Sequence, residues 1–510
     1  MTQNFLPFQY EINRIENNLT SFAGLPLYID LANAIGLTQS IEQSLQTKTQ
    51  GWNDSQSILS LIMLNLAGGT CLEDIERLQN DEGLTKLLLK AETYGMKRSE
   101  RRAYERQFRK SKKRALPSTS SLRRYLEQFH YAEQEDLREE GKAFIPEKNK
   151  FLQVLVKLND KLIEFSQKQN LCKTATLDQD ATLSATTKRN ALYCYEKYKA
   201  YQPFNTYWSE QNLVIHSEFR DGNVPAGFEQ LRLLKEAIDM LPTSVEKVFL
   251  RSDSAGYQQD LLNYCAKGEN ERFGVIEFAI AAKVTQSFKE AVAQVSDWHP
   301  IYKEGFEGDR IQTEQEWAEV CFVPNFLSYS KDAPALRYLA IREPMAVQET
   351  LPGIEPAQRD LPFQTVVLST REYKIFGVVT NREIEGEALI HWHRERCGQS
   401  EKIHFTEKTD FAGGQFPSNK FGANAAWWQI MVLSLNLNNL MKQHAFPEHL
   451  KTKGMKSIRY HVIGVAGRLI KHARGLFIRL SGGIEMAKLL SSIRQRILLL
   501  IGLPEEVSTA

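Results

Sequence analysis

The sequence predicts an α/β protein, in which one mixed sheet is flanked by helical regions. Two apolar segments, residues 172–182 and 245–253, have the pattern of buried strands and carry acids toward their ends. Two further strand-like segments and a helical segment separate them, as expected for a mixed sheet. With 510 residues the chain is too long for a single compact core, so we expect two to four domains.

The composition is typical of a soluble globular protein, with 42% hydrophobic residues and a mean hydropathy of −0.39. The formal net charge is only +2, so any nucleic-acid surface must be a local patch. No apolar run approaches the roughly 18 residues that suggest a membrane span, and residues 1–7 lack the features of a signal peptide. We therefore expect a cytoplasmic protein without a membrane partner. The six scattered cysteines form no CxxC pair, which favours buried thiols over disulfides or zinc ligands.

Residues 1–150 are expected to form a helical DNA-binding domain. Residues 55–66 are strongly apolar and end at Gly68 and Gly69, and residues 71–78 repeat apolar positions at helical spacing. Within this domain, the segment 97–114 contains ten basic residues and only two acidic ones.

This basic segment has two interpretations. It is either a solvated helix face or linker, or a contact to the DNA backbone, where neutralised phosphates release counterions. Tyr104 and Phe108 are interleaved with the charges, but their i, i+4 spacing also fits a packing seam. Pro117 then opens a second helix, which makes a helix-turn-helix-like module plausible. The predicted DNA-binding residues are Lys97, Arg98, Arg101, Arg102, Arg106, Arg109, Lys110, Lys112, Lys113, Arg114, Arg123 and Arg124.

The central part of the chain alternates strand-like and helical segments. After a helical segment at 151–167, we expect strands at 172–182, 191–198, 213–219, 245–253 and 274–282, with helices at 227–241 and 257–266. Three antiparallel strands, a crossover helix, a parallel strand, a helix and another strand form the order of a ribonuclease-H-like fold. Residues 151–294 would be the first part of this catalytic core.

The core is expected to be interrupted and then resumed. Residues 295–385 contain strand-like runs at 317–323, 337–342, 364–368 and 374–380, so we predict an inserted β subdomain. Helices at 385–395 and 424–435 indicate that residues 386–440 form the second part of the core. Residues 441–510 are expected to form a helical, basic C-terminal tail.

The acids at the strand ends are the candidate catalytic residues. Asp178, Asp180 and Thr182 share one face of their strand because side chains alternate. Carboxylates that lie close together need a positive partner, commonly a divalent cation. We favour Asp180 over Asp178 because Asp180 lies nearer the strand end. Asp178 is either the ligand in its place or a neighbour in the same metal site.

Asp180, Asp253 and Glu401 together would suit two Mg²⁺ ions about 3.5–4 Å apart, the arrangement for in-line phosphoryl transfer on DNA or RNA. Asp253 has a structural alternative as a turn cap. Glu395 and Glu407 compete with Glu401 for the third position, unless they are simply solvated helix acids.

Several blocks of the sequence resemble the DDE transposases of bacterial insertion sequences, in the IS-four-like group and the IS-thirteen-eighty type. The blocks are Leu-Asp-Gln-Asp-Ala-Thr at 177–182, Tyr-Gln-Pro-Phe at 201–204, Leu-Arg-Ser-Asp-Ser-Ala-Gly-Tyr at 250–257 and the Arg, Glu, Lys series of 396–408. Asn424 with its helix, and residues 66–69 with Asp74, also fit.

The resemblance implies that Asp180, Asp253 and Glu401 are the catalytic acids, with Arg396, Lys408 and Thr182 as accessory residues. It implies two Mg²⁺ ions, for which Mn²⁺ can substitute. The activity would be cut-and-paste transposition: binding of terminal inverted repeats, end cleavage through a hairpin intermediate, and strand transfer into target DNA by a homodimer. The alternatives are an inactive DNA-binding derivative and a structure-specific nuclease. The tryptophans Trp317, Trp392, Trp427 and Trp428 either stack a flipped base or belong to the core.

Overall fold

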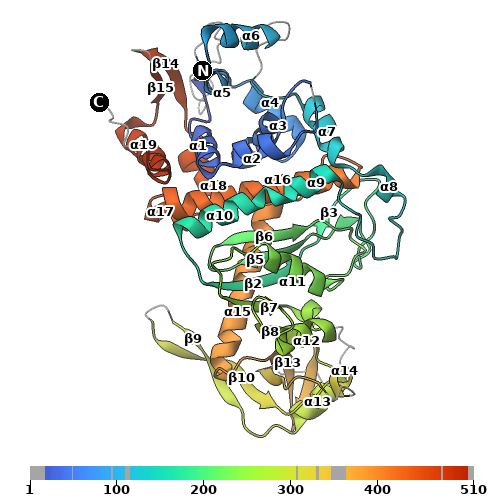
Figure 1. The fold of residues 1–510 in the computed structure, drawn as a ribbon. Helices are drawn as coiled ribbons and strands as arrows, with labels where there is room; N and C mark the ends of the chain where they lie inside the picture. The colour runs from blue at the N-terminus through green and yellow to red at the C-terminus, as the bar shows by residue number, and fades with distance from the viewer. Residues whose placement is uncertain are drawn as a thin grey trace, which may run out of the picture. The chain divides into compact units, whose positions relative to one another are not determined.

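The computed structural model describes residues 18–48, 50–93, 96–108, 115–305, 308–328, 332–345, 363–472 and 475–503 (Figure 1). The chain divides into two compact units. The first unit consists of Met1–Gln128, Asp410–Ala412 and Leu440–Ala510, and the second of Phe129–Thr409 and Gly413–Asn439.

The second unit is built on a large mixed sheet, which confirms the predicted α/β class. Its strand order is β6-β5-β2-β7-β8-β13-β11-β10-β9, with β12 paired to β13. β2 pairs antiparallel with β5 and parallel with β7, and β7 pairs parallel with β8. These strands are β2 (Thr174–Ala181), β5 (Phe204–Trp208), β6 (Leu213–Glu218), β7 (Lys247–Ser252) and β8 (Glu277–Ala282).

Helices cover both faces of this sheet (Figure 1). Asn159 of α10 (Asn159–Gln169) and Asn436 of α16 (Phe421–Leu440) both donate to the carbonyl of Val214 in β6. On the other face, Glu236 of α11 (Gln230–Asp239) lies 3.0 Å from the ring of His216 in β6. Since His216 and Ser217 alternate along β6, and Ser217 contacts α16, the two groups of helices lie on opposite sides. α9 (Lys150–Lys157) precedes α10, and α12 (Gln259–Lys267) links β7 to β8.

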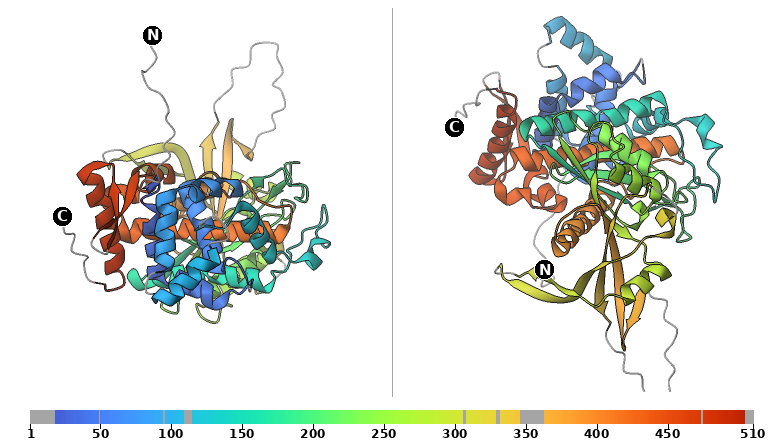
Figure 2. Two further views of the ribbon diagram at one scale, coloured as in Figure 1. Left: turned by 90° about the horizontal axis from the view of Figure 1, so that it is seen from above. Right: turned by 60° about the horizontal axis from the view of Figure 1, so that its bottom comes forward.

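The strands of the predicted insertion continue the core sheet. β13 (Arg371–Thr380) pairs antiparallel with β8, and β11 (Arg337–Pro344), β10 (Arg310–Val320) and β9 (His299–Glu304) follow in order. The short β12 (Thr365–Leu368) adds to β13. Figure 2 draws these strands in yellow and tan beside the orange-brown helix α15 (Gly386–Phe405). The insertion therefore shares a sheet and a core with the strands that precede it.

One predicted strand is wrong. Residues 191–198 form no strand, and Tyr193 makes only an isolated bridge with Lys199. The middle antiparallel strand is instead β5, whose five residues are all buried. The tyrosines at 193 and 195 alternate with other residues, which is the period of a strand, although no strand forms there. Pro203 predicts a turn, yet it directly precedes β5, because a proline is tolerated at the beginning of a strand.

The N-terminal part of the first unit is helical, as predicted. α3 (Asp54–Ala67) begins with a capping box in which Asn53 and Gln56 exchange side-chain and backbone contacts, and it ends at Gly68 with φ 91°. The other helices of this part are α1 (Leu25–Ile35), α2 (Leu37–Ser44), α4 (Ile75–Gln79), α5 (Glu82–Glu92), α6 (Arg98–Phe108) and α7 (Thr119–Leu126).

The C-terminal region is not helical throughout, contrary to the prediction. β14 (Gly467–His472) and β15 (Gly475–Leu480) form a hairpin, and β14 also pairs with β1 (Leu19–Thr20). Buried and exposed positions alternate from Val465 to Leu469, which is the period of a strand and not of a helix. In the described part of this region, the helical elements are α17 (Glu448–Lys451), α18 (Met455–Ile458), α19 (Gly483–Leu499) and the π-helical turns Met441–Ala445 and Arg459–Ile463.

All six cysteines are free thiols, but the prediction that they are buried holds only for Cys194 and Cys265, since Cys71, Cys172 and Cys397 are half-buried and Cys321 is exposed. In the described ranges no single helix is long and apolar enough to cross a membrane, and Asp54–Ala67 with Leu72–Gln79 pass that test only as a pair bent by 95°.

Candidate active site

Two of the predicted acids meet at one edge of the sheet. Asp180 is the penultimate residue of β2, and Asp253 directly follows β7. The two strands are parallel and adjacent, with Gln179 opposite Ser252, so their carboxyl ends lie side by side. The pKa of Asp253 is raised, first by burial and then by the negative charge of Asp180. The two carboxylates therefore lie close enough for the charge of Asp180 to raise the pKa of Asp253.

Asp253 also has the structural role that the sequence left open. Its Oδ1 accepts a hydrogen bond of 3.0 Å from the amide of Ala255, and it caps the short turn Ser254–Gly256. Because the cap fixes the side chain, Asp253 is held at the strand end in a defined orientation.

Two cationic side chains of α15 face Asp180. Arg396 Nη1 lies 3.3 Å and His404 Nε2 lies 3.5 Å from the same oxygen, Asp180 Oδ2. Both residues are more than nine-tenths buried. Burial alone would lower the pKa of His404, but its interactions with Asp180 and Glu407 outweigh burial and raise the pKa to about 9. Near neutral pH, Asp180 is therefore flanked by two positive charges.

Glu407 completes a polar chain behind Asp180. It is fully buried. Its Oε1 accepts a hydrogen bond of 2.8 Å from Asn205 Nδ2, and its Oε2 lies 3.2 Å from His404 Nδ1. Asn205 is the residue of β5 that pairs with Asp180. Glu407 belongs to a π-helical turn, Thr406–Asp410, that continues α15, and such turns are frequent at functional sites.

Asp178 lies on the same face but in a different environment. Only 1% of it is exposed, and Arg251 binds both carboxylate oxygens at 2.6 and 2.9 Å. Burial raises its pKa although Arg251 opposes this. Arg251 also donates to Glu395 and to the carbonyl of Trp392, each at 2.7 Å. Asp178 is thus engaged in a buried ion pair between β2, β7 and α15.

Glu401 is exposed on α15. It lies three residues before His404, and 3.6 residues per turn place it about 60° around the helix from that residue. Among the residues that the structure describes, no three His, Cys, Asp or Glu side chains come together as a metal site. The structure therefore unites Asp180 with Asp253 and leaves Glu401 outside their immediate cluster.

The accessory residues lie around the same edge. The amide of Thr182 donates 2.9 Å to the carbonyl of Pro203, and Lys408 Nζ lies 3.3 Å from the carbonyl of Leu183. Both contacts fix the backbone that leaves β2 after Asp180. Thr182 and Lys408 therefore contact the backbone next to the candidate site.

The tryptophans have mostly core roles. Trp427, Trp428 and Trp317 are 1%, 0% and 8% exposed, so a base cannot reach their rings without disrupting the core. Trp392 is half-buried, and the guanidinium groups of Arg251 and Arg382 lie 5.3 and 4.3 Å from the centre of its ring.

Sequence reasoning missed His404 and Asn205. His404 stands within the block 396–408, but a histidine there carries no recognisable ligand spacing. Asn205 lies 202 residues before its partner Glu407, so no local pattern links them. The pairing of β5 with β2 places Asn205 beside Asp180, and α15 brings His404 to it.

The predicted DNA-binding residues lie in the first unit. Lys97 precedes α6, which carries Arg98, Arg101, Arg102 and Arg106. Outside the described residues are Arg109, Lys110, Lys112, Lys113 and Arg114. α7 begins at a Ser118 cap, and its Arg123 forms a 2.7 Å ion pair with Glu73 while Arg124 is exposed. Tyr104 hydrogen-bonds Glu92, so it takes part in packing.

Comparison with known proteins identifies the family of the chain. No curated protein matches the chain. A family profile described as "Transposase DDE domain group 1" matches residues 11–323 and 364–501. Because the match spans most of the sequence, the chain belongs to the transposase DDE domain group 1 family.

Proposed function

We propose that this DDE transposase carries out cut-and-paste transposition of an insertion sequence of the IS-four-like group and IS-thirteen-eighty type. It would bind terminal inverted repeats, cleave the ends through a hairpin intermediate, and join the 3′-hydroxyls to target DNA. Two ends must be held together, so the working form would be a homodimer. The observation that carries the proposal is the meeting of Asp180 and Asp253 beside Arg396 and His404.

The two acids are suited to a divalent cation. Their mutual repulsion contributes to the raised pKa of Asp253, and a cation between them would relieve it. Carboxylate oxygens are the hard ligands that Mg²⁺ and Mn²⁺ prefer. When bound, two such ions would activate a water or 3′-hydroxyl and stabilise the leaving oxygen. A ribonuclease-H-like core would place both acids as this sheet does.

Glu401 is our candidate for the third acid. Glu395 is paired with Arg251, and Glu407 with His404 and Asn205. Glu401 is exposed on the helix that supplies Arg396 and His404, so its carboxylate is accessible to solvent and to ions. When DNA binds, rotation of the Glu401 side chain toward Asp180 would bring the third acid to Asp180 and Asp253.

Arg396 and His404 would act on the phosphate. The Arg396 Nε atom is buried and lacks a hydrogen-bond partner in the described structure, whereas His404 Nε2 faces Asp180 Oδ2 at 3.5 Å. A buried donor without an acceptor is costly, so a non-bridging phosphate oxygen is a suitable partner. Lys408, at the backbone after Asp180, would add positive charge.

The test uses purified protein and duplexes carrying the inverted repeats that flank its gene. With Mg²⁺ or Mn²⁺ the protein should nick and join these duplexes, and EDTA should abolish both reactions. Glu401→Ala should bind the duplex in a gel-shift assay without cutting it, whereas Glu395→Gln should still cut.

Other outcomes would revise the proposal in defined ways. Normal cutting by Glu401→Ala with loss of cutting by Glu407→Gln would move the third acid to Glu407. Cutting without joining would identify a nuclease. Binding without any cutting would identify an inactive DNA-binding derivative.

A further inference from the structure

A hairpin leaves the strand end that carries Asp180 and returns into β5. It consists of residues 182–203 and is called the tyrosine hairpin below. Its base is closed by the Thr182 amide and by the pairing of β3 (Ser184–Ala185) with β4 (Ala200–Tyr201). At its tip, the amide of Cys194 donates 2.9 Å to the carbonyl of Tyr198. Lys197 has φ 65°, so the tip is a three-residue turn closed by a left-handed residue.

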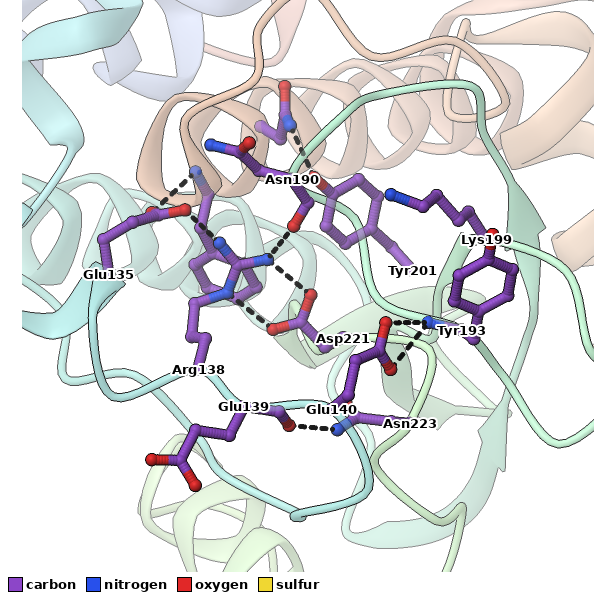
Figure 3. A network of polar contacts seen from close by, with 12 residues as sticks. Glu135, Arg138, Glu139, Glu140, Asn190, Tyr193, Lys199, Tyr201, Asp221 and Asn223 are labelled. Carbon is purple, nitrogen blue, oxygen red and sulfur yellow. Dashed lines mark hydrogen bonds and ion pairs between the residues drawn. The ribbon is translucent and has the colours of Figure 1, made fainter.

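Charged side chains fasten this hairpin to the rest of the second unit (Figure 3). Arg138 binds both oxygens of Asp221 at 2.7 Å and donates 2.8 Å to the carbonyl of Asn190 in the hairpin. Glu140 accepts from the amide of Tyr193 at 3.2 and 3.3 Å (Figure 3). These contacts fix the backbone before the solvent-facing tip, and the amide of Gly222 fixes it after the tip by donating 3.0 Å to the carbonyl of Ala200.

The fixed tip presents aromatic rings to solvent. Tyr195 is 74% exposed and Tyr193 is 51% exposed. Lys199 Nζ lies 5.6 Å from the centre of the Tyr193 ring and donates to the carbonyl of Arg189. Between residues 186 and 199 there are four basic residues and one acidic residue, namely Lys188, Arg189, Lys197, Lys199 and Glu196.

This combination has a specific chemical use. Adjacent aromatic rings held on a rigid backbone lose little conformational entropy when a flat ligand stacks on them. Nearby lysines and arginines attract phosphates, whereas they would repel a second copy of the same basic hairpin. Aromatic faces with surrounding basic charge are the pattern of surfaces that bind unpaired nucleotides.

We propose that the tyrosine hairpin is a stacking platform for unpaired DNA bases next to the scissile phosphate, with Tyr195 as the main stacking residue. The inference rests on the proposed function, because it places the platform on the chain segment that directly follows Asp180. A duplex buries its bases in the stack and offers only phosphates to the tip. Unpaired nucleotides at a cleaved or opened end offer both base faces and phosphates.

The experiment measures binding of two fluorescent duplexes to the full-length protein in Mg²⁺-free buffer. Both carry a flanking inverted repeat, and one continues as three unpaired thymines. The wild type should bind the extended duplex roughly tenfold more tightly than the blunt one. Tyr195→Ala should lose this preference and bind both duplexes like the blunt one. Tyr195→Phe, which keeps the ring, should retain it.

A matched variant controls for the loss of an exposed tyrosine. Tyr460 lies outside the tyrosine hairpin and is 80% exposed, so Tyr460→Ala should retain the preference. A Tyr195→Ala variant that still prefers the extended duplex would overturn the inference. So would a change from dimer to monomer in Tyr195→Ala without an effect on DNA, since the hairpin would then be a protein contact.

Failure of the inference differs from failure of the proposed function. If the wild type cuts the duplexes with Mg²⁺ but Tyr195 has no effect on the preference, only the platform is refuted. If the preference depends on Tyr195 but no duplex is cut, the platform stands without transposition.

Discussion

Asp178 and Asp180 lie two residues apart on one face of β2, yet their surroundings give them different roles. The guanidinium group of Arg251 occupies both oxygens of Asp178, while Asp180 is half-buried beside Asp253. Arg251 also reaches Glu395 on α15. The Asp178–Arg251 ion pair therefore connects β2 to β7, and Arg251 connects both strands to α15 next to the candidate site.

Replacement of Arg251 by Met should destabilise the protein strongly. It would leave Asp178 buried without a cation, and breaking a buried ion pair typically costs about 3–5 kcal/mol. The free energy of unfolding in urea measures the loss. The double variant Asp178→Asn with Arg251→Met should recover part of it, because the uncompensated charge is then absent.

A surface pair provides the matched control. Lys173 and Glu246 form an ion pair of 2.9 Å in which both side chains are 64% exposed. Replacement of Lys173 by Met should change the free energy of unfolding by less than about 1 kcal/mol. Equal losses for Lys173→Met and Arg251→Met would contradict the structural role of the buried pair.

His393 should make stability depend on pH. It is buried against the carbonyl of Ser252, and burial lowers its pKa to about 4. In the unfolded chain histidine takes up a proton near pH 6.5, so the unfolded state binds more protons between pH 6.5 and 4. Stability from this group is therefore lost as the pH falls through that window, by on the order of 3 kcal/mol.

The pH effect can be assigned by substitution. Urea midpoints of the wild type should fall between pH 7 and 4.5, and the fall should be smaller in His393→Gln. His449 is exposed and serves as the control, since His449→Gln should keep the slope of the wild type. An unchanged slope in His393→Gln would show that other groups cause the acid sensitivity.

The position of Asp180 and Asp253 at one edge of the sheet could be predicted from the sequence, because each acid lies at the end of a segment with a local strand pattern. Their environment could not be, since Arg251 comes from β7, Asn205 from β5 and His404 from α15. The partner of a buried charge is decided by strand register, which local periodicity does not contain.

At the scale of elements, α15 approaches the sheet closely at its first residue. A Cβ atom on Gly386 would lie 2.1 Å from a ring carbon of Trp317 in β10. Gly386→Ala should therefore destabilise the protein by about 1–3 kcal/mol through overpacking, although alanine favours helices.

Gly398 in the same helix gives the opposite expectation. No atom lies within 4 Å of its hypothetical Cβ, so Gly398→Ala should stabilise the protein by up to about 1 kcal/mol. Thermal unfolding of both variants tests the pair. If Gly386→Ala also stabilised the protein, the close packing of α15 on β10 would be refuted.

Elements with strong periodicity could be predicted, and those with ambiguous signals could not. α3 and β7 follow from apolar patterns with clear ends. Residues 191–198 alternate tyrosine with other residues but turn their rings to solvent, so the same period arises without a sheet. The strands β14 and β15 mix apolar residues with basic ones, so their strand pattern was hidden in the basic tail, and the pairing of β14 with β1 spans most of the chain.

At the scale of the whole molecule, binding and cutting are assigned to different units. The predicted DNA-contact arginines of α6 belong to the first unit, and the acids belong to the second. Substitutions in α6 should therefore weaken DNA binding without lowering the cutting rate of the protein–DNA complex.

Replacement of Arg98, Arg101 and Arg102 by Gln should weaken binding of every DNA sequence to a similar extent. All three arginines are exposed on α6, and each phosphate that is no longer neutralised should reduce the slope of log K against log salt by roughly 0.9. The cutting rate at saturating DNA should stay near that of the wild type. The control replaces three solvent-accessible lysines of the second unit, Lys142, Lys161 and Lys173, by Gln and should leave the slope nearly unchanged. Equal slopes for the two triple variants would mean that α6 is a solvated helix and that DNA is held elsewhere.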